Sequence, residues 1–232
     1  MNVLAFDTCL GAVSAAVCRV DVAGLHVLAE AYEARTTGHA ERLMPMVEET
    51  VARSGIALGD IDRLAVSLGP GSFTGVRIGV AAARALALAT GKPAVGVTSL
   101  AAMAHAARQV LGDNAKGRLL AVAVDARAGM VYVQLFEDGG ASSAPMLLAP
   151  AEAAAMIGTQ RSCIVVGSAG VAVADAVAGG QVEAALVDLQ PHARAVAGLA
   201  AGLAPAGPLR PLYLRRPDAK LQGDKSLPRV AS

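Results

Sequence analysis

The sequence predicts an α/β protein built from two duplicated subdomains, each a mixed sheet flanked by helices. The first observation is a repeat: residues 3–17 read VLAFDTCLGAVSAAV and residues 121–135 read AVAVDARAGMVYVQL. Both segments are apolar strands that end in an aspartate, Asp7 or Asp125, with a glycine four residues later and a second strand beyond it. The second observation is that helices and strands alternate after each hairpin, which implies a duplicated unit with both parallel and antiparallel strands.

In the first half, the hairpin is followed by a third strand and then by helices and strands in alternation. The stretch after the third strand is amphipathic, because Leu43, Val47 and Val51 recur at four-residue spacing opposite acidic side chains. Pro45 would kink this helix unless the helix begins near Arg42. The elements expected, in order, are a strand at His26–Tyr32, a helix at His39–Ser54, a strand at Asp62–Leu68, a helix at Thr74–Thr90 and a strand at Ala94–Val97.

The second half repeats this order with shorter elements. The elements expected are a crossing helix at Ser99–Leu111, a strand at Met146–Ala149, a helix from Pro150, a strand at Cys163–Val166, a helix at Val171–Ala178, a strand at Ala185–Leu189 and a helix at Pro191–Leu203. We therefore expect a first lobe over residues 1–98, a smaller second lobe over 99–217 and a disordered tail over 218–232.

Composition and charge exclude several classes of protein. Hydrophobic residues make up 54% of the 232 residues, which is enough for a large buried core. The formal net charge is +1, and no basic stripe indicates that this chain alone binds a nucleic acid. The three cysteines have unrelated spacings, which predicts neither a disulfide framework nor a metal site and favours a cytoplasmic location. The N-terminus has no Lys or Arg before its apolar residues and reaches Asp7 at once, so we expect no signal peptide. Charged residues or prolines interrupt the apolar runs, so we expect no membrane span.

The stretch SLGPGSFTGVRIG, residues 67–79, connects a strand to the helix that follows it. It lacks the lysine of a P-loop and the glycine spacing of a dinucleotide fingerprint, so it is a weak phosphate signal. The proline, the glycines and a capping Ser72 or Thr74 suit a tight strand-to-helix turn. Arg77 and Arg84 share one face of the helix. Small residues on another face predict a ridge that a second helix can approach closely: Gly75, Gly79, Ala83 and Ala87.

The order of elements resembles that of the superfamily of actin, Hsp70 and the sugar kinases, in which two lobes face each other across a cleft. There, each hairpin turn holds nucleotide phosphates with an Asp near a metal, small residues and a hydroxyl. The first turn here keeps Asp7 and Thr8. The second has alanines and Arg127 where glycines are expected, and Met130 in place of a hydroxyl. We therefore expect no cofactor on this chain, and vestigial phosphate turns at Asp7, Thr8, Gly11, Gly69, Gly71, Ser72 and Asp125.

Five motifs follow one another along nearly all of the chain. They are LAFDTC at 4–9, GHAERLMP at 38–45, the stretch at 67–79 in the form SxGPGSFTGxRIG, VDARAGMVY at 124–132 and PLYLR at 211–215. As a set they resemble the signature of the bacterial tRNA threonylcarbamoyladenosine biosynthesis family TsaB, also called YeaZ. The chain departs from that signature in the second hairpin, at Ala128 and Met130, so any contact that the family makes there stays open.

The resemblance implies a noncatalytic subunit that binds a related catalytic subunit, TsaD, and keeps it active. TsaD transfers a threonylcarbamoyl group to the adenosine beside the anticodon of tRNAs that read codons beginning with A. The resemblance also implies a heterodimer with TsaD, a larger complex with the ATPase TsaE, and contact with tRNA only through that complex. ATP and a divalent metal would then belong to the partner subunits, and homodimers through the same surface are expected when TsaD is absent.

The same resemblance places the docking surface on the first two helices and the metal of TsaD on an HxxxH pair. His39 corresponds to the first histidine of that pair, but Leu43 stands four residues later, so the pair of imidazoles is incomplete. We therefore expect no catalytic residue and no metal ligand on this chain. The expected partner interface consists of His39, Leu43, Met44, Val47, Val51, Gly75, Gly79, Ala83 and Ala87.

Two enzymatic alternatives stay open at this point. An ATPase or phosphotransferase of the actin-like class would use Asp7, Thr8 and the turn at 69–72, although the altered second hairpin speaks against it. A metalloprotease-like enzyme acting alone would need a bound metal. The basic residues that follow Tyr213 fit either a contact with tRNA in the assembled complex or a solvated tail.

Overall fold

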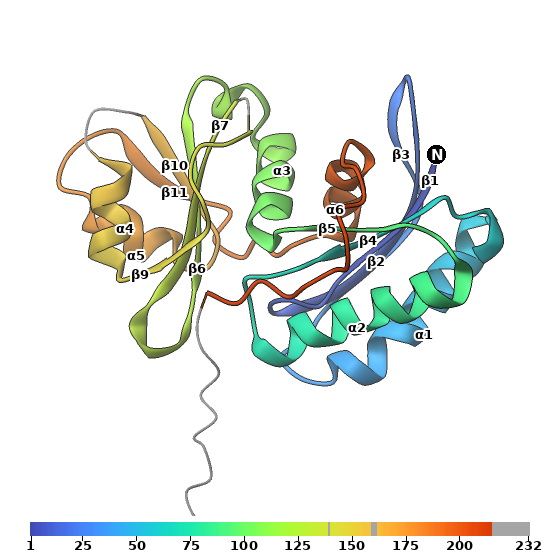
Figure 1. Ribbon diagram of the computed structural model, residues 1–232. Helices are drawn as coiled ribbons and strands as arrows, with labels where there is room; N and C mark the ends of the chain where they lie inside the picture. The colour runs from blue at the N-terminus through green and yellow to red at the C-terminus, as the bar shows by residue number, and fades with distance from the viewer. Residues whose placement is uncertain (139, 159–161, 215–232) are drawn as a thin grey trace, which may run out of the picture.

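The computed structural model describes residues 1–138, 140–158 and 162–214, which form two lobes side by side (Figure 1). Each lobe is built around one sheet. Between the two sheets lie the helices α3 (Ser99–Leu111) and α6 (Ala193–Ala201). The tail expected over 218–232 lies outside the described residues.

The first sheet has five strands in the order β3-β2-β1-β4-β5. Its central strand β1 pairs antiparallel with β2 and parallel with β4, so that Ala5 lies opposite Ala16 on one side and Ala65 on the other. The strands are β1 (Asn2–Asp7), β2 (Ala12–Asp21), β3 (Gly24–Ala34), β4 (Arg63–Ser67) and β5 (Ala94–Val97). The strands expected from the sequence in this half are confirmed.

Helices cover both faces of the first sheet because successive residues of its strands are apolar and point to opposite faces. Leu4 and Phe6 lie on one face, and Val3 and Ala5 lie on the other, where they pack against α6. The face with Phe6 is covered by α1 (His39–Ser54) and α2 (Phe73–Thr90). Figure 1 shows α1 and α2 on the opposite side of this sheet from α6.

The second sheet has six strands, in the order β11-β10-β6-β7-β8, with β9 also paired to β7. They are β6 (Leu119–Asp125), β7 (Val131–Glu137), β8 (Gly140–Ala141), β9 (Met146–Leu148), β10 (Cys163–Val166) and β11 (Val182–Ala185). One face packs against α3. The other face packs against α4 (Pro150–Ile157) and α5 (Gly170–Ala176).

The two sheets repeat one topology. In each, a central strand pairs antiparallel with the other strand of its hairpin and parallel with a later strand: β1 with β2 and β4, β6 with β7 and β10. A third antiparallel strand, β3 or β9, lies beyond the hairpin, and a last parallel strand, β5 or β11, lies at the far edge. This is the duplicated actin-like fold that the sequence predicts.

Three expectations differ in detail from the structure. The strand expected at Ala185–Leu189 is wrong, because β11 ends at Ala185 and Leu186 takes a positive φ of 48°. Helix α1 begins at His39 and includes Pro45, so the proline does not delay its start to Arg42. The last helix, α6, covers the first sheet although it follows the second in sequence. The lobe boundary at residue 98 stays a prediction.

Candidate functional site

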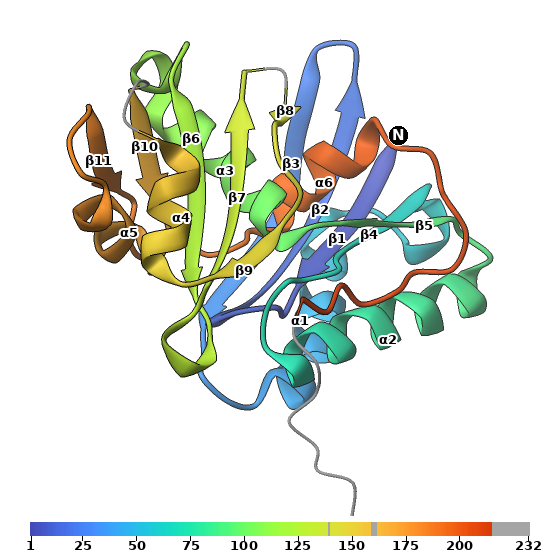
Figure 2. The same ribbon diagram turned by 60° about the vertical axis from the view of Figure 1, so that its left-hand side comes forward.

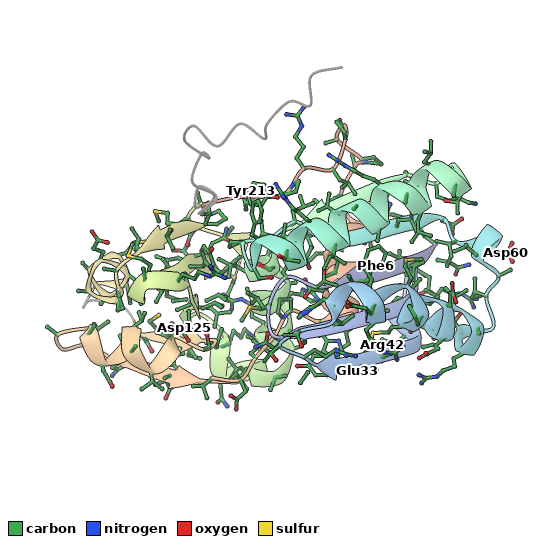
Figure 3. The ribbon with its side chains drawn as sticks, turned by 90° about the horizontal axis from the view of Figure 1, so that it is seen from below. Phe6, Glu33, Arg42, Asp60, Asp125 and Tyr213 are labelled. Atoms are coloured by element: carbon green, nitrogen blue, oxygen red, sulfur yellow. The ribbon has the colours of Figure 1, made fainter. Side chains whose placement is uncertain are left out.

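A cleft of about 820 Å³ opens between the lobes. The first hairpin turn and the N-terminal residues of α1 and α2 line it from the first lobe, and residues 124–127 line it from the second. Five of the predicted site residues lie in this lining: Gly11, His39, Gly71, Ser72 and Asp125. Asp7, Thr8 and Gly69 are buried in the first lobe. Figure 3 shows Asp125 on the second lobe and Tyr213 beside the start of α2.

Polar groups of the first hairpin turn are engaged within the protein. The Cys9 N–H donates to Asp7 Oδ1 at 3.2 Å, and the Gly11 N–H donates to Gln190 Oε1 at 2.9 Å. The Thr8 hydroxyl donates to the Gly75 carbonyl oxygen at 2.6 Å, which joins the turn to α2. A turn bonded in this way serves the packing of the lobe. The sequence does not indicate that Gln190 contacts this turn, because Gln190 lies in a loop far away along the chain.

Asp7 is a buried carboxyl group, 1% exposed, at the end of β1. Its Oδ2 has no hydrogen-bond partner. Burial raises the pKa of Asp7 to about 6, against the opposing effect of the nearby Ser67 side chain and of the Cys9 N–H, which favour the charged form. The carboxyl group therefore changes charge near pH 6, well above the usual range for aspartate.

The second hairpin turn is also closed on itself. The Asp125 N–H donates to Ser168 Oγ at 2.9 Å, and the Ala126 N–H donates to the Met130 carbonyl oxygen at 2.8 Å. Ala128 takes a positive φ of 61°, a conformation that glycine adopts at no cost and alanine does not. The alanine that the sequence shows in place of glycine thus sits at a strained point of the turn.

The glycines of the ridge predicted on α2 face the lobe's own turn. A Cβ on Gly75 would lie 2.0 Å from the Thr8 carbonyl oxygen, and a Cβ on Gly79 would lie 2.8 Å from Thr8 Oγ1. Ala83, on the same side of the helix, is fully buried. The ridge does permit a close approach, but the approaching backbone is the first hairpin turn. Its assignment to a partner helix is therefore corrected.

The other residues of the expected partner interface divide in the same way. Leu43 and Val47 are 1% and 3% exposed and pack in the core beneath α1, so their assignment to a docking surface is also corrected. His39 lies in the cleft, where its Nε2 lies 3.0 Å from the Leu10 carbonyl oxygen. The three residues left at least partly exposed are Met44, Val51 and Ala87.

The side of α2 that faces away from the sheet is exposed and, beside Arg77 and Arg84, carries apolar residues. Ala81 and Ala85 are exposed, and the Leu88 side chain is 88% exposed. Only 28% of the 18-residue helix is buried, and by length and composition the helix is apolar enough to cross a membrane. We call Ala81, Ala85 and Leu88 the outer face of α2.

A C-terminal segment runs back from α6 along α2 to the edge of the cleft (Figure 2). Arg84 donates from its Nε to the Leu209 carbonyl oxygen at 2.9 Å, and Arg77 donates from its Nε to the Tyr213 hydroxyl at 2.8 Å. The Arg77 guanidinium also lies 3.7 Å from the centre of the Phe73 ring. Nothing in the C-terminal segment itself indicates that it packs on α2; the shared face of Arg77 and Arg84 is the signal in the sequence.

Comparisons with known proteins agree with these observations. A family model described as "TsaD: tRNA N6-adenosine threonylcarbamoyltransferase" matches residues 26–167. An uncharacterized protein of Mycobacterium tuberculosis is 38% identical over 225 residues, 94% of each chain. The tRNA threonylcarbamoyladenosine biosynthesis protein TsaB of Escherichia coli is 42% identical over 132 residues, 57% of this chain and 53% of that protein. The structure of YeaZ from Pseudomonas aeruginosa has a TM-score of 0.73 at 29% identity, over 86% of this chain and 90% of that chain. The chain belongs to the TsaB/YeaZ family.

Motifs of this TsaB/YeaZ-family chain meet at the cleft edge of the first lobe. Thr8, from the first motif, donates to Gly75 in the stretch that opens α2. The backbone N–H of Leu212, in the last motif, donates to the Leu68 carbonyl oxygen at 2.7 Å. His39 contacts the first hairpin turn. These four motifs therefore belong to one structural unit in the first lobe, whereas the motif at 124–132 lies in the second.

The residues that could hold a metal ion do not gather in this part of the family fold. At the position of a second imidazole on α1, Leu43 packs in the core. Over 1–138, 140–158 and 162–214, no group of three His, Cys, Asp or Glu side chains is placed to hold a metal ion.

Proposed function

We propose that this chain is a noncatalytic subunit of the system that adds threonylcarbamoyl to the adenosine beside the anticodon of tRNAs reading codons that begin with A. In this proposal it binds and activates a TsaD-type catalytic subunit. The names of its relatives support the pathway, since E. coli TsaB is named for threonylcarbamoyladenosine biosynthesis. The observation that carries the binding role is the outer face of α2.

The outer face of α2 exposes more apolar surface than the fold needs. The buried side of the helix already packs Val76, Val80 and Ala83 against the first sheet. On the opposite side, Leu88 contributes a large apolar side chain that is 88% exposed, next to the small Ala85. Alanines allow another helix to approach closely, and a large apolar side chain beside them supplies buried area on binding.

Helix α1 packs beside α2 and carries exposed charge. Glu41 and Glu48 are exposed on it, with Pro45 and Ala52 between and beyond them. An apolar centre with a charged rim is the usual make-up of a protein–protein interface. The proposal therefore expects the partner to place basic side chains opposite Glu41 and Glu48 and apolar side chains opposite Ala85 and Leu88.

The apolar character of α2 also fits a membrane span by length and composition. We favour protein docking because the glycine side of α2 packs against the first hairpin turn and Arg77 and Arg84 hold the C-terminal segment. We propose a cytoplasmic location for the same reason. ATP and a divalent metal would belong to the partner subunits, TsaE would join a larger complex, and this chain would meet tRNA only there. Homodimers through the same face are expected in the absence of TsaD.

Co-purification with the TsaD-type subunit of the same organism tests the proposal. Leu88→Glu places a charge in the centre of the outer face and is expected to weaken association at least tenfold and to lower threonylcarbamoyladenosine in tRNA, measured by mass spectrometry of nucleosides. Val110→Glu is the matched control, because Val110 is 63% exposed on α3, away from this face. Wild-type association by Leu88→Glu, with its fold intact by circular dichroism, would contradict the docking role.

A further inference from the structure

Gln190 lies in the connector that leads from β11 in the second lobe to α6 on the first sheet, and its side chain lines the interlobe cleft. Its Oε1 accepts a hydrogen bond from the Gly11 N–H, with 2.9 Å between the nitrogen and the oxygen. A Cβ on Gly11 would lie 3.4 Å from the same oxygen. The carboxamide therefore rests directly on the backbone of the first hairpin turn.

Contacts on either side of Gln190 fix the connector in place. Leu189 packs against two apolar clusters, one that contains α6 and one that contains α3. The His192 ring stacks on Tyr32, with 5.1 Å between the ring centres and 11° between the planes. The Ala193 N–H donates to the buried hydroxyl of Ser14 at 3.0 Å. The position of Gln190 thus follows from the packing of its neighbours.

Several positive groups surround this contact, in a cleft that is also lined by the Asp125 carboxylate. The N-terminal residues of two long helices reach the cleft, His39 of α1 and Phe73 of α2, and helix N-termini carry partial positive charge. Arg127 of the second lobe lines the same cleft. A backbone N–H of a turn in such a place is a donor for an anionic oxygen. The oxygen of a carboxamide accepts the same hydrogen bond but carries no net charge.

We propose that Gln190 is an internal substitute for an anion. Its carboxamide occupies the place on the first hairpin turn that a phosphate oxygen would take, and it thereby closes the turn to a polyphosphate chain. The side chain satisfies the Gly11 N–H without a ligand, so the cleft is kept in a form that does not take up nucleotide phosphates. This inference is independent of the docking role of α2.

Tripolyphosphate titrated into the full chain tests the inference, with affinity from calorimetry and the Gly11 amide followed by ¹H–¹⁵N NMR. Gln190→Ala removes the acceptor, and Gln190→Asn withdraws it by one methylene. Both variants are expected to bind tripolyphosphate about tenfold more tightly than wild type, because the anion no longer has to displace the Gln190 carboxamide from the Gly11 N–H. In both, the Gly11 resonance is expected to shift during the titration.

Two controls separate this effect from general changes in charge or stability. Gln190→Glu keeps an acceptor on the turn and adds a negative charge, so it is expected to bind no more tightly than wild type. Gln181→Ala removes an exposed glutamine of the second lobe and is expected to match wild type. Equal affinity of wild type and Gln190→Asn for tripolyphosphate would overturn the inference. So would tighter binding of tripolyphosphate without a shift of the Gly11 resonance. If Gln190→Ala does not fold, Gln190→Asn alone decides the outcome.

Discussion

Asp7 shows how the environment of a single side chain sets a pH response. Its folded-state pKa of about 6 lies above the ordinary value of 3.8, because burial outweighs the hydrogen bonds that favour the charged form. The folded protein therefore binds this proton more tightly than the unfolded chain does. The stability associated with it is fully present below pH 3.8 and is lost as the pH rises through about 6.

Asp7→Asn is expected to stabilise the protein at pH 7, by up to about 3 kcal/mol, because the amide carries no charge to bury. The Asn side chain still offers an oxygen to the Cys9 N–H. The gain over wild type is expected to shrink as the pH falls from 7 to 4. Urea unfolding at several pH values measures it, and a gain that is independent of pH would contradict the raised pKa.

At Gly79 the restriction is steric rather than electrostatic, because there is no room for a side chain. Gly79→Leu is expected to lower the free energy of unfolding by about 3 kcal/mol, because its Cβ alone would lie 2.8 Å from Thr8 Oγ1. Gly59→Leu is the matched control, since nothing lies within 4 Å of a Cβ there, and an effect within about 0.5 kcal/mol is expected. Denaturant unfolding that shows equal stability for both variants would contradict the close approach.

The sequence predicts the close approach along α2 but not the group that makes it. Gly75, Gly79 and Ala83 recur at a spacing that identifies one face of a helix, and glycine within a helix indicates contact with a backbone. The spacing does not say which face of α2 turns toward its own sheet, because the opposite face, with Ala85 and Leu88, is apolar as well. The contact between Thr8 and Gly75 decides which face of α2 turns toward the lobe, and this contact is seen only in the folded structure.

At the scale of elements, the prediction succeeds where periodicity and end signals coincide. The bounds of α3 and β10 agree with those expected, because Thr98 caps α3 through the Ala101 N–H and β10 is a short apolar run. The prediction fails at β11 because the apolar run and the end of the strand do not coincide there. The apolar run continues past Ala185, and the positive φ of Leu186 ends the strand without a glycine to mark it.

The C-terminal segment beside α2 has no hydrophobic periodicity that would predict its position. It is held in place by hydrogen bonds from two arginines. Arg84→Ala is expected to lower the free energy of unfolding by about 1–2 kcal/mol, because it removes charged donors from the Leu209 carbonyl oxygen. Exchange of the Leu212 amide hydrogen, which bonds to Leu68, is expected to quicken. Mass spectrometry of hydrogen exchange measures this, with Lys92→Ala as control; unchanged exchange at Leu212 would contradict the role of Arg84.

At the scale of the whole molecule, the duplication is readable from the sequence and the connection between the lobes is not. The paired motifs around Asp7 and Asp125 predict two equivalent sheets, which the strand orders confirm. Nothing in residues 193–201 indicates that this helix covers the first sheet rather than the second, because an alanine-rich face fits either. The same limit applies to Gln190, whose partner Gly11 lies at the other end of the chain.

The return of the chain to the first lobe has a consequence for biosynthesis. Residues 119–185 form the second sheet as one continuous stretch, whereas one layer of the first lobe requires Ala193, Ala197 and Ala200 of α6. As the ribosome makes the protein from its N-terminus, the half that emerges first must wait for the last helix before its sheet is covered on both sides. The lobe translated second is thus the first that can be completed. A truncation that removes α6 would leave one face of the first lobe's sheet uncovered.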